Sequence, residues 1–127
     1  MTALDFLQKA ERALNSAQAL LDLGDVDGAC NRAYYAMFDA ARAALQALPD
    51  TNASEAFKTH SGLISAFSLH LVKSGRVPVE FGRSLNRLAD LRQVADYASA
   101  PIDMATAKQA VDEARLFVEQ MRALTPN

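Results

Sequence analysis

The chain has 127 residues with thirteen Lys and Arg against fifteen Asp and Glu, which gives a net charge of −2. This length fits one domain, residues 1–127, and the near-neutral charge excludes a uniformly basic nucleic-acid binder. Its single cysteine, Cys30, excludes a disulfide framework and a cysteine-based zinc site. No apolar run reaches the roughly 18 residues that span a bilayer, and the start lacks the apolar core of a signal peptide. We therefore expect a cytoplasmic protein.

The residue mix predicts an all-α fold. Alanine (25) and leucine (16) far outnumber valine, isoleucine and threonine, which together number 14. Good helix formers thus dominate over residues that favour strands.

The spacing of apolar residues predicts five helices, over about residues 3–23, 25–48, 59–74, 78–97 and 103–124. Gly24 and Gly75 end the first and third helices. Asp25 or Asp27 caps the second helix and Asp103 caps the fifth. Residues 50–54, which follow Pro49, form the longest predicted loop.

The last predicted helix has the most regular apolar seam, made of Met104, Ala107, Val111, Ala114, Val118 and Met121. A seam that alternates by three and four suits a helical bundle or an interface between two chains. Short connections between the helices favour antiparallel neighbours. The expected architecture is an up-and-down four-helix bundle with an additional short or fifth helix.

Charge is distributed unevenly along the chain. Residues 1–57 carry four basic and eight acidic residues, whereas residues 58–92 carry six basic and two acidic ones. The basic segment has two interpretations: solvated helix faces paired with acidic neighbours, which is favoured for Arg83 and Arg87, or an electropositive surface for phosphates.

Arg92 lies among the apolar positions of the fourth predicted helix, with Asp96 one turn further on. Because a buried guanidinium is costly without an acceptor, the two residues form either a structural pair or part of a polar cleft. Such a cleft would bind an anion or perform phosphodiester chemistry.

A polar stripe also borders the apolar face of the second predicted helix. It consists of Asn31, Tyr35 and Arg42, with Arg32 and Asp39 slightly further round. A tyrosine hydroxyl here could satisfy Arg92 or Asp96 across the bundle.

Neither histidine belongs to a metal motif. His60 lies at the start of the third predicted helix and His70 almost three turns further on, so one helix cannot bring both to one metal ion. The sequence contains no HExxH, Walker, GxSxG or dinucleotide motif, and we expect neither metal nor cofactor.

Three segments carry a family resemblance. Residues 24–45 (GDVDGACNRAYYAMFDAARAAL), 59–78 (THSGLISAFSLHLVKSGRVP) and 85–98 (LNRLADLRQVADYA) resemble, in the same order, segments of small bacterial HEPN-domain proteins. The resemblance covers about residues 3–122. It implies a four-helix bundle that usually forms a homodimer with a polar cleft near the dimer axis. Many members are metal-independent endoribonuclease toxins paired with a small nucleotidyltransferase antitoxin.

The family's active motif is an arginine followed four to six residues later by a histidine. Arg92 matches the arginine, but Asp96 and Tyr97 stand in the window where the histidine is expected. Asp39 likewise stands where relatives commonly carry histidine. By resemblance to toxins that are nucleotidylated on tyrosine, Tyr97 is a candidate modification site.

Three functional hypotheses follow. In the first, the protein binds RNA, a nucleotide or a nucleotidyltransferase through the Arg92 cleft, with Asn31, Tyr35, Asp39 and Arg42 as ligand-binding residues. In the second, it is an endoribonuclease in which Asp96, Tyr97 or His60 assists Arg92, and His60 does so only if the third helix reaches the same cleft. In the third, Arg92 and Asp96 only stabilise the fold.

Overall fold

The computed structural model describes residues 1–49, 59–97 and 101–126. It contains α1 (Ala3–Asp22), α2 (Val26–Gln46), α3 (His60–Phe67), the π-helical segment η1 (Ser68–Val72), α4 (Val79–Tyr97) and α5 (Met104–Leu124). These ranges hold helices and no strands, which confirms the all-α prediction. No helix among them is long and apolar enough to cross a membrane.

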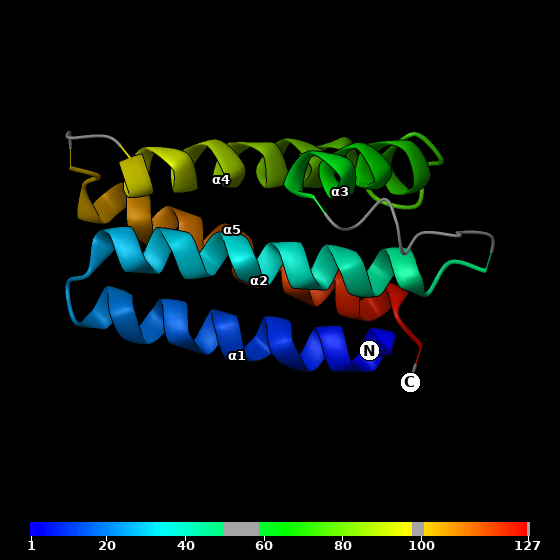
Figure 1. The fold of residues 1–127 in the computed structure, drawn as a ribbon, viewed down its shortest axis with the longest axis horizontal. Coiled ribbons are helices and arrows are strands. Elements are labelled where there is room, and N and C mark those ends of the chain that lie inside the picture. Colours follow the sequence, from blue (N-terminus) through cyan, green and yellow to red (C-terminus); the bar gives the residue numbers. More distant parts are fainter. Residues whose placement is uncertain (50–58, 98–100, 127) are drawn as a thin grey trace.

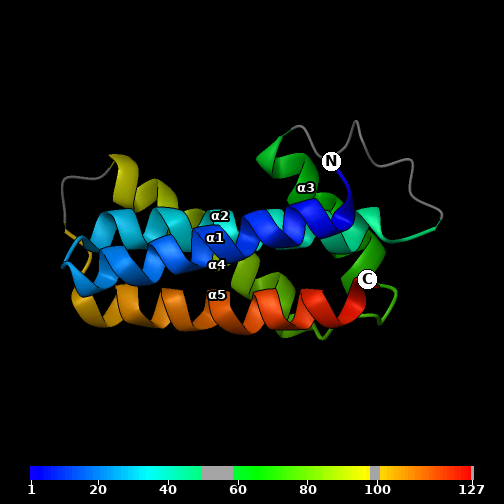
Figure 2. The same ribbon diagram turned by 90° about the horizontal axis from the view of Figure 1, so that it is seen from below.

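The four long helices run alternately in opposite directions along the long axis of the molecule (Figure 1). They form the predicted up-and-down bundle, in which α2 contacts α1, α3, α4 and α5. The additional short helix is α3, which lies on the opposite side of α2 from α5 (Figure 2). Because α3 and α4 both pack on α2, residues from three helices can meet on one face of α2.

The helix ends follow the cues in the sequence. The side chains of Asp25, Thr59 and Asp103 each accept a hydrogen bond from a backbone N–H in the first turn of α2, α3 and α5. Thr59, rather than His60, is thus the residue that caps α3, and the His60 side chain is left for other contacts. Gly24 and Gly75 adopt φ angles of +83° and +80°, a left-handed conformation that favours glycine.

The third predicted helix is present from His60 to Val72, but its second half is a π-helix rather than an α-helix. The α-helical pattern ends at Phe67, and the chain continues as a π-helix through Val72. The N–H of Lys73 donates to the carbonyl of Ser68 at 2.9 Å, which is the wider i to i−5 pattern. Packing against α4 accompanies this turn, since a Cβ atom at Gly82 would come within 3.1 Å of Val72 Cγ2. Apolar spacing alone does not report such a tertiary constraint.

Alanine dominates the contact between α1 and α2. The fully or almost fully buried alanines are Ala10, Ala13 and Ala17 on α1 and Ala29, Ala33, Ala36, Ala40, Ala41, Ala43 and Ala44 on α2. Helix axes approach more closely where small side chains form the contact. The two helices therefore form a closely packed pair.

The apolar seam of α5 faces the inside of the bundle. Ala107, Val111, Ala114, Val118 and Met121 are all buried in the core. Of the two interpretations of this seam, the bundle is correct for these five positions, which are not available as an interface between chains. Met104, the first residue of the predicted seam, is 46% exposed and lies outside the core.

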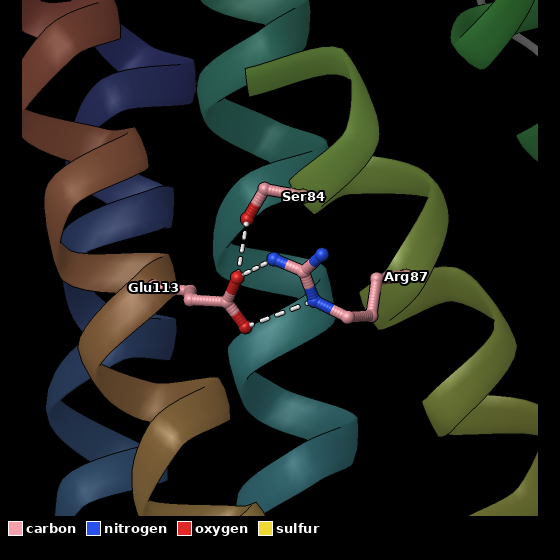
Figure 3. A network of polar contacts seen from close by, with 3 residues as sticks. All are labelled: Ser84, Arg87 and Glu113. Atoms are coloured by element: carbon pink, nitrogen blue, oxygen red, sulfur yellow. Dashed lines mark hydrogen bonds and ion pairs between the residues drawn. The ribbon is translucent and has the colours of Figure 1, made fainter. Parts of the chain in front are cut away.

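An ion pair joins α4 to α5 (Figure 3). The Glu113 carboxylate pairs with the Arg87 guanidinium and accepts a hydrogen bond of 3.3 Å from Ser84 Oγ. The acidic-neighbour interpretation is thus correct for Arg87, and one positive charge of the basic segment is neutralised. Arg83 is exposed and makes no ion pair within the described residues.

Candidate functional site

Arg92 of α4 lies over two aromatic rings of α2. Its guanidinium carbon is 5.8 Å from the ring centroid of Tyr34 and 5.5 Å from that of Tyr35. Only 17% of the Arg92 side chain is exposed. A guanidinium over aromatic faces is stabilised by the negative charge of the ring faces, and more strongly where water is excluded.

His60, the first residue of α3, packs on the same rings. Its ring centroid lies 5.4 Å from that of Tyr34, 5.7 Å from that of Tyr35 and 4.9 Å from that of Phe38. The structure therefore places His60 beside Arg92, the arrangement that the sequence left open. We call Tyr34, Tyr35, Phe38, His60 and Arg92 the His60–Arg92 cluster.

The electrostatics of the cluster favour a neutral imidazole. Burial lowers the pKa of His60 below its usual value of 6.5, and the positive charge of Arg92 lowers it further. At neutral pH, His60 is therefore ready to accept a proton, while Arg92 remains charged beside it.

Asp96 and Asn31 lie at the edge of the cluster. The Asp96 Oδ2 atom is 3.4 Å from Arg92 Nε, so the expected i,i+4 pair forms. Asn31 Nδ2 lies 3.5 Å from each carboxylate oxygen of Asp96. The carboxylate thereby links α2 to α4 and holds the guanidinium in place.

Tyr34 contacts Arg92 with its ring and not with its hydroxyl. The hydroxyl is buried and has no hydrogen-bond partner among the described residues. Burial raises the pKa of Tyr34 to about 12, so the group stays protonated. Tyr34 is a residue of the core, and its hydroxyl does not reach Arg92 or Asp96.

A Tyr34→Phe substitution should raise the free energy of unfolding by about 1 kcal/mol, because it removes a buried hydroxyl without a partner and keeps the ring. Urea denaturation of both proteins measures the change. Tyr35→Phe, at a partly exposed ring, is the matched control. A loss of 1 kcal/mol or more in Tyr34→Phe would mean that the hydroxyl has a partner after all.

Three further candidate residues line one pocket between α1 and α2. Tyr35, Asp39 and Arg42 surround a hollow of about 250 Å³ together with Lys9, Arg32 and Phe38, and we call it the Asp39 pocket. Asn31 does not line it. The sequence analysis did not identify Lys9 as a candidate, because the sequence does not show which face of α1 packs against α2.

Tyr97 is separate from both groups. It ends α4 with 80% of its surface exposed and makes no described contact with the His60–Arg92 cluster. His70 is exposed on η1 and lies outside the cluster as well. In residues 1–49, 59–97 and 101–126, no group of three or more His, Cys, Asp or Glu side chains could hold a metal ion.

Known proteins similar to this chain include three of particular use. A UPF0332 protein, glr0978, from Gloeobacter violaceus is 44% identical over 96 residues, which cover 76% of this chain and 72% of the relative. A UPF0332 protein from Thermotoga maritima is 36% identical over 90 residues, 71% of this chain and 64% of the relative. A protein from Methanocaldococcus jannaschii named "Putative toxin MJ0605" is 31% identical over 116 residues, 91% of this chain and 83% of the relative.

The HEPN domain family matches residues 3–124, which is nearly the whole chain. This match agrees with the helical bundle and with the three segments that carry the resemblance in the sequence. The chain belongs to the HEPN domain family.

Proposed function

We propose that the protein is the toxin of a toxin–antitoxin-like pair and that it cleaves single-stranded RNA without a metal ion at the His60–Arg92 cluster. One observation carries this proposal: His60 and Arg92, from different helices, contact the same two tyrosine rings. The cluster thus combines a neutral imidazole with a permanent cation. The toxin names of two relatives from Methanocaldococcus jannaschii support the same biological setting.

The proposed reaction is an attack of the ribose 2′-oxygen on the adjacent phosphorus. His60 takes the proton of the 2′-hydroxyl, and Arg92 stabilises the negative charge that develops on the phosphoryl oxygens. The bond from phosphorus to the 5′-oxygen breaks, and that oxygen takes a proton from water. The products are a 2′,3′-cyclic phosphate and a 5′-hydroxyl end.

Asp96 is assigned a positioning role in this scheme. Its carboxylate lies against Arg92 Nε, and Asn31 holds it from α2. The contact is an ion pair and not a hydrogen bond, since Arg92 Nε is buried without a hydrogen-bond partner among the described residues; in this proposal the remaining donors of the guanidinium bind the phosphate. In this proposal, His60 performs the role that the family motif gives to its histidine, and Asp96 does not.

A second candidate function is the binding of RNA or a nucleotide without cleavage. The observation that favours it is that the His60–Arg92 cluster holds a single imidazole. Metal-free cleavage is fastest with both a base and an acid in place. In the third hypothesis, Arg92 and Asp96 serve stability alone.

We further propose a homodimer and a nucleotidyltransferase antitoxin in the cytoplasm as the setting. A mostly apolar groove of about 340 Å³ between α4 and α5, lined by Leu91, Val94 and Ala110 among others, supports a second chain at this face. The exposed ring of Tyr97 supports its assignment as the residue that a nucleotidyltransferase would modify.

The test is the incubation of the full chain with end-labelled single-stranded RNA in the presence of EDTA. We expect cleavage with 2′,3′-cyclic phosphate ends, which resist phosphatase until acid opens them to a 2′- or 3′-monophosphate. A DNA strand of the same sequence is the control, because it lacks the 2′-hydroxyl. An intact RNA after prolonged incubation would overturn the cleavage proposal, and retained RNA binding would then favour the second candidate.

A further inference from the structure

The Asp39 pocket contains a buried carboxylate without a partner. Only 3% of Asp39 is exposed, and it forms no hydrogen bond or ion pair with the described residues. A buried charge is costly unless it is paired. Burial therefore raises the pKa of the Asp39 carboxyl, and the positive charges of nearby basic residues offset part of this increase.

Cations surround this carboxylate at longer range. Lys9, Arg32 and Arg42 line the same pocket, and their charges act on Asp39 without forming an ion pair with it. The Arg42 guanidinium lies over the rings of Phe6 and Phe38, at 4.5 Å and 5.5 Å. Its Nε atom is buried without a hydrogen-bond partner among the described residues. Arg42 Nε is therefore a buried, unsatisfied donor at the wall of this pocket, and the Asp39 carboxylate lines the same pocket without a hydrogen bond from a described residue.

These charges define the ligand that the pocket fits. The three cations favour an anionic group such as a phosphate, while Asp39 favours a group that donates hydrogen bonds. A simple anion offers nothing to Asp39, and a simple cation is repelled by the basic residues. A nucleotide satisfies both requirements, because it carries a phosphate together with a base that donates hydrogen bonds.

The carboxylate further selects among the bases. Guanine presents two adjacent donors, N1–H and the 2-amino group, which match the two oxygens of one carboxylate. Adenine, cytosine and uracil lack such a pair on the corresponding edge. In single-stranded RNA these edges are free for recognition by protein side chains.

The pocket is continuous with the His60–Arg92 cluster. Tyr35 and Phe38 belong to both, and the guanidinium carbons of Arg32 and Arg92 lie 5.7 Å and 5.5 Å from the Tyr35 ring centroid. The volume of about 250 Å³ is below the ~300 Å³ at which pockets for drug-sized ligands begin, so the pocket would hold part of a nucleotide and leave the rest outside.

We propose that the Asp39 pocket binds a guanine nucleotide of the RNA strand next to the scissile phosphate. Asp39 recognises the base, and Lys9, Arg32 and Arg42 bind the phosphate. The position beside the scissile bond rests on the proposed cleavage, whereas the preference for guanine does not.

Calorimetric titration of the full chain with 5′-GMP, 5′-AMP, 5′-CMP and 5′-UMP tests the pocket. We expect 5′-GMP to bind about tenfold or more tightly than the other three. Asp39→Asn should abolish this preference, because an amide offers one acceptor in place of two, and Arg32→Ala should weaken the binding of all four. Asp27→Asn, at an exposed aspartate of the same helix, should change neither.

Equal affinity for the four nucleotides, or no binding of any at millimolar concentration, would overturn the proposal. Both results come from the unmodified protein and do not depend on the folding of a variant. Arg92→Ala separates the two proposals, since it should stop cleavage and retain the preference for 5′-GMP. A preference for guanine without any cleavage would support guanine binding in the Asp39 pocket and overturn the proposed RNA cleavage. Cleavage without any preference for guanine would support the cleavage and overturn guanine binding.

Discussion

Arg92→Ala should lower the rate of metal-free RNA cleavage at least about 100-fold, because it removes the cation that stabilises the developing phosphorane charge. Arg92→Lys should retain only a small part of the rate. Lysine keeps the charge but lacks the flat guanidinium that lies over Tyr34 and Tyr35. Cleavage of labelled RNA under single-turnover conditions with EDTA measures both effects.

Arg83→Ala is the matched control for this prediction. Arg83 lies on the same helix, is exposed and makes no ion pair in the described part of the chain, so its loss should leave the rate within about twofold. Urea denaturation of each variant separates chemistry from folding. A large loss of stability in Arg92→Ala, together with full activity of the folded fraction, would show that Arg92 serves only the fold.

His60→Gln should lower cleavage about 100-fold or more, because it removes the group that accepts the 2′-hydroxyl proton. In the unmodified protein, the rate should rise with pH through the pKa of His60, which lies below 6.5, and level off near neutrality. His70→Gln is the control, since His70 is exposed on η1. Equal losses in the two variants, or a rate that does not change between pH 5 and 7, would contradict the role of His60.

NMR titration of His60 measures the electrostatic effect of Arg92 on this histidine. Loss of the positive charge in Arg92→Ala should shift the titration of the His60 ring protons to higher pH, toward the ordinary pKa. Because the folded pKa lies below the unfolded one, the unfolded chain binds more protons in this window. Stability contributed by neutral His60 is therefore present above the unfolded pKa and declines as pH falls toward the folded value. An unchanged titration would mean that Arg92 does not act on His60.

Local signals in the sequence predict most of the fold. Asp25 and Asp103 accept hydrogen bonds from backbone N–H groups in the first turns of α2 and α5, and Gly24 adopts a left-handed φ angle after α1. Each of these helix ends therefore depends only on residues a few positions away in the sequence. The buried face of α5 follows from spacing for the same reason. The π-helix after Phe67 depends on how the chain packs on α4, and apolar spacing carries no information about it.

The candidate site was predicted only in part. Arg92 and Asp96 are one turn apart, so helix geometry alone brings them together. His60 and Lys9 reach their sites only through the placement of α3 and α1 against α2. Such placements depend on the packing of whole helices, which one sequence does not specify at the level of single side chains.

The alanine contact between α1 and α2 has a consequence for how this protein diversifies. Alanine loses no rotamer entropy on burial, so the buried alanines hold together the two helices that carry Lys9 and Arg32 without ordering long side chains. Substitutions of pocket residues, including the buried Asp39, can then change ligand preference while the helix pair stays the same. We expect relatives with different RNA preferences to differ at these pocket positions and to share the small residues between the helices.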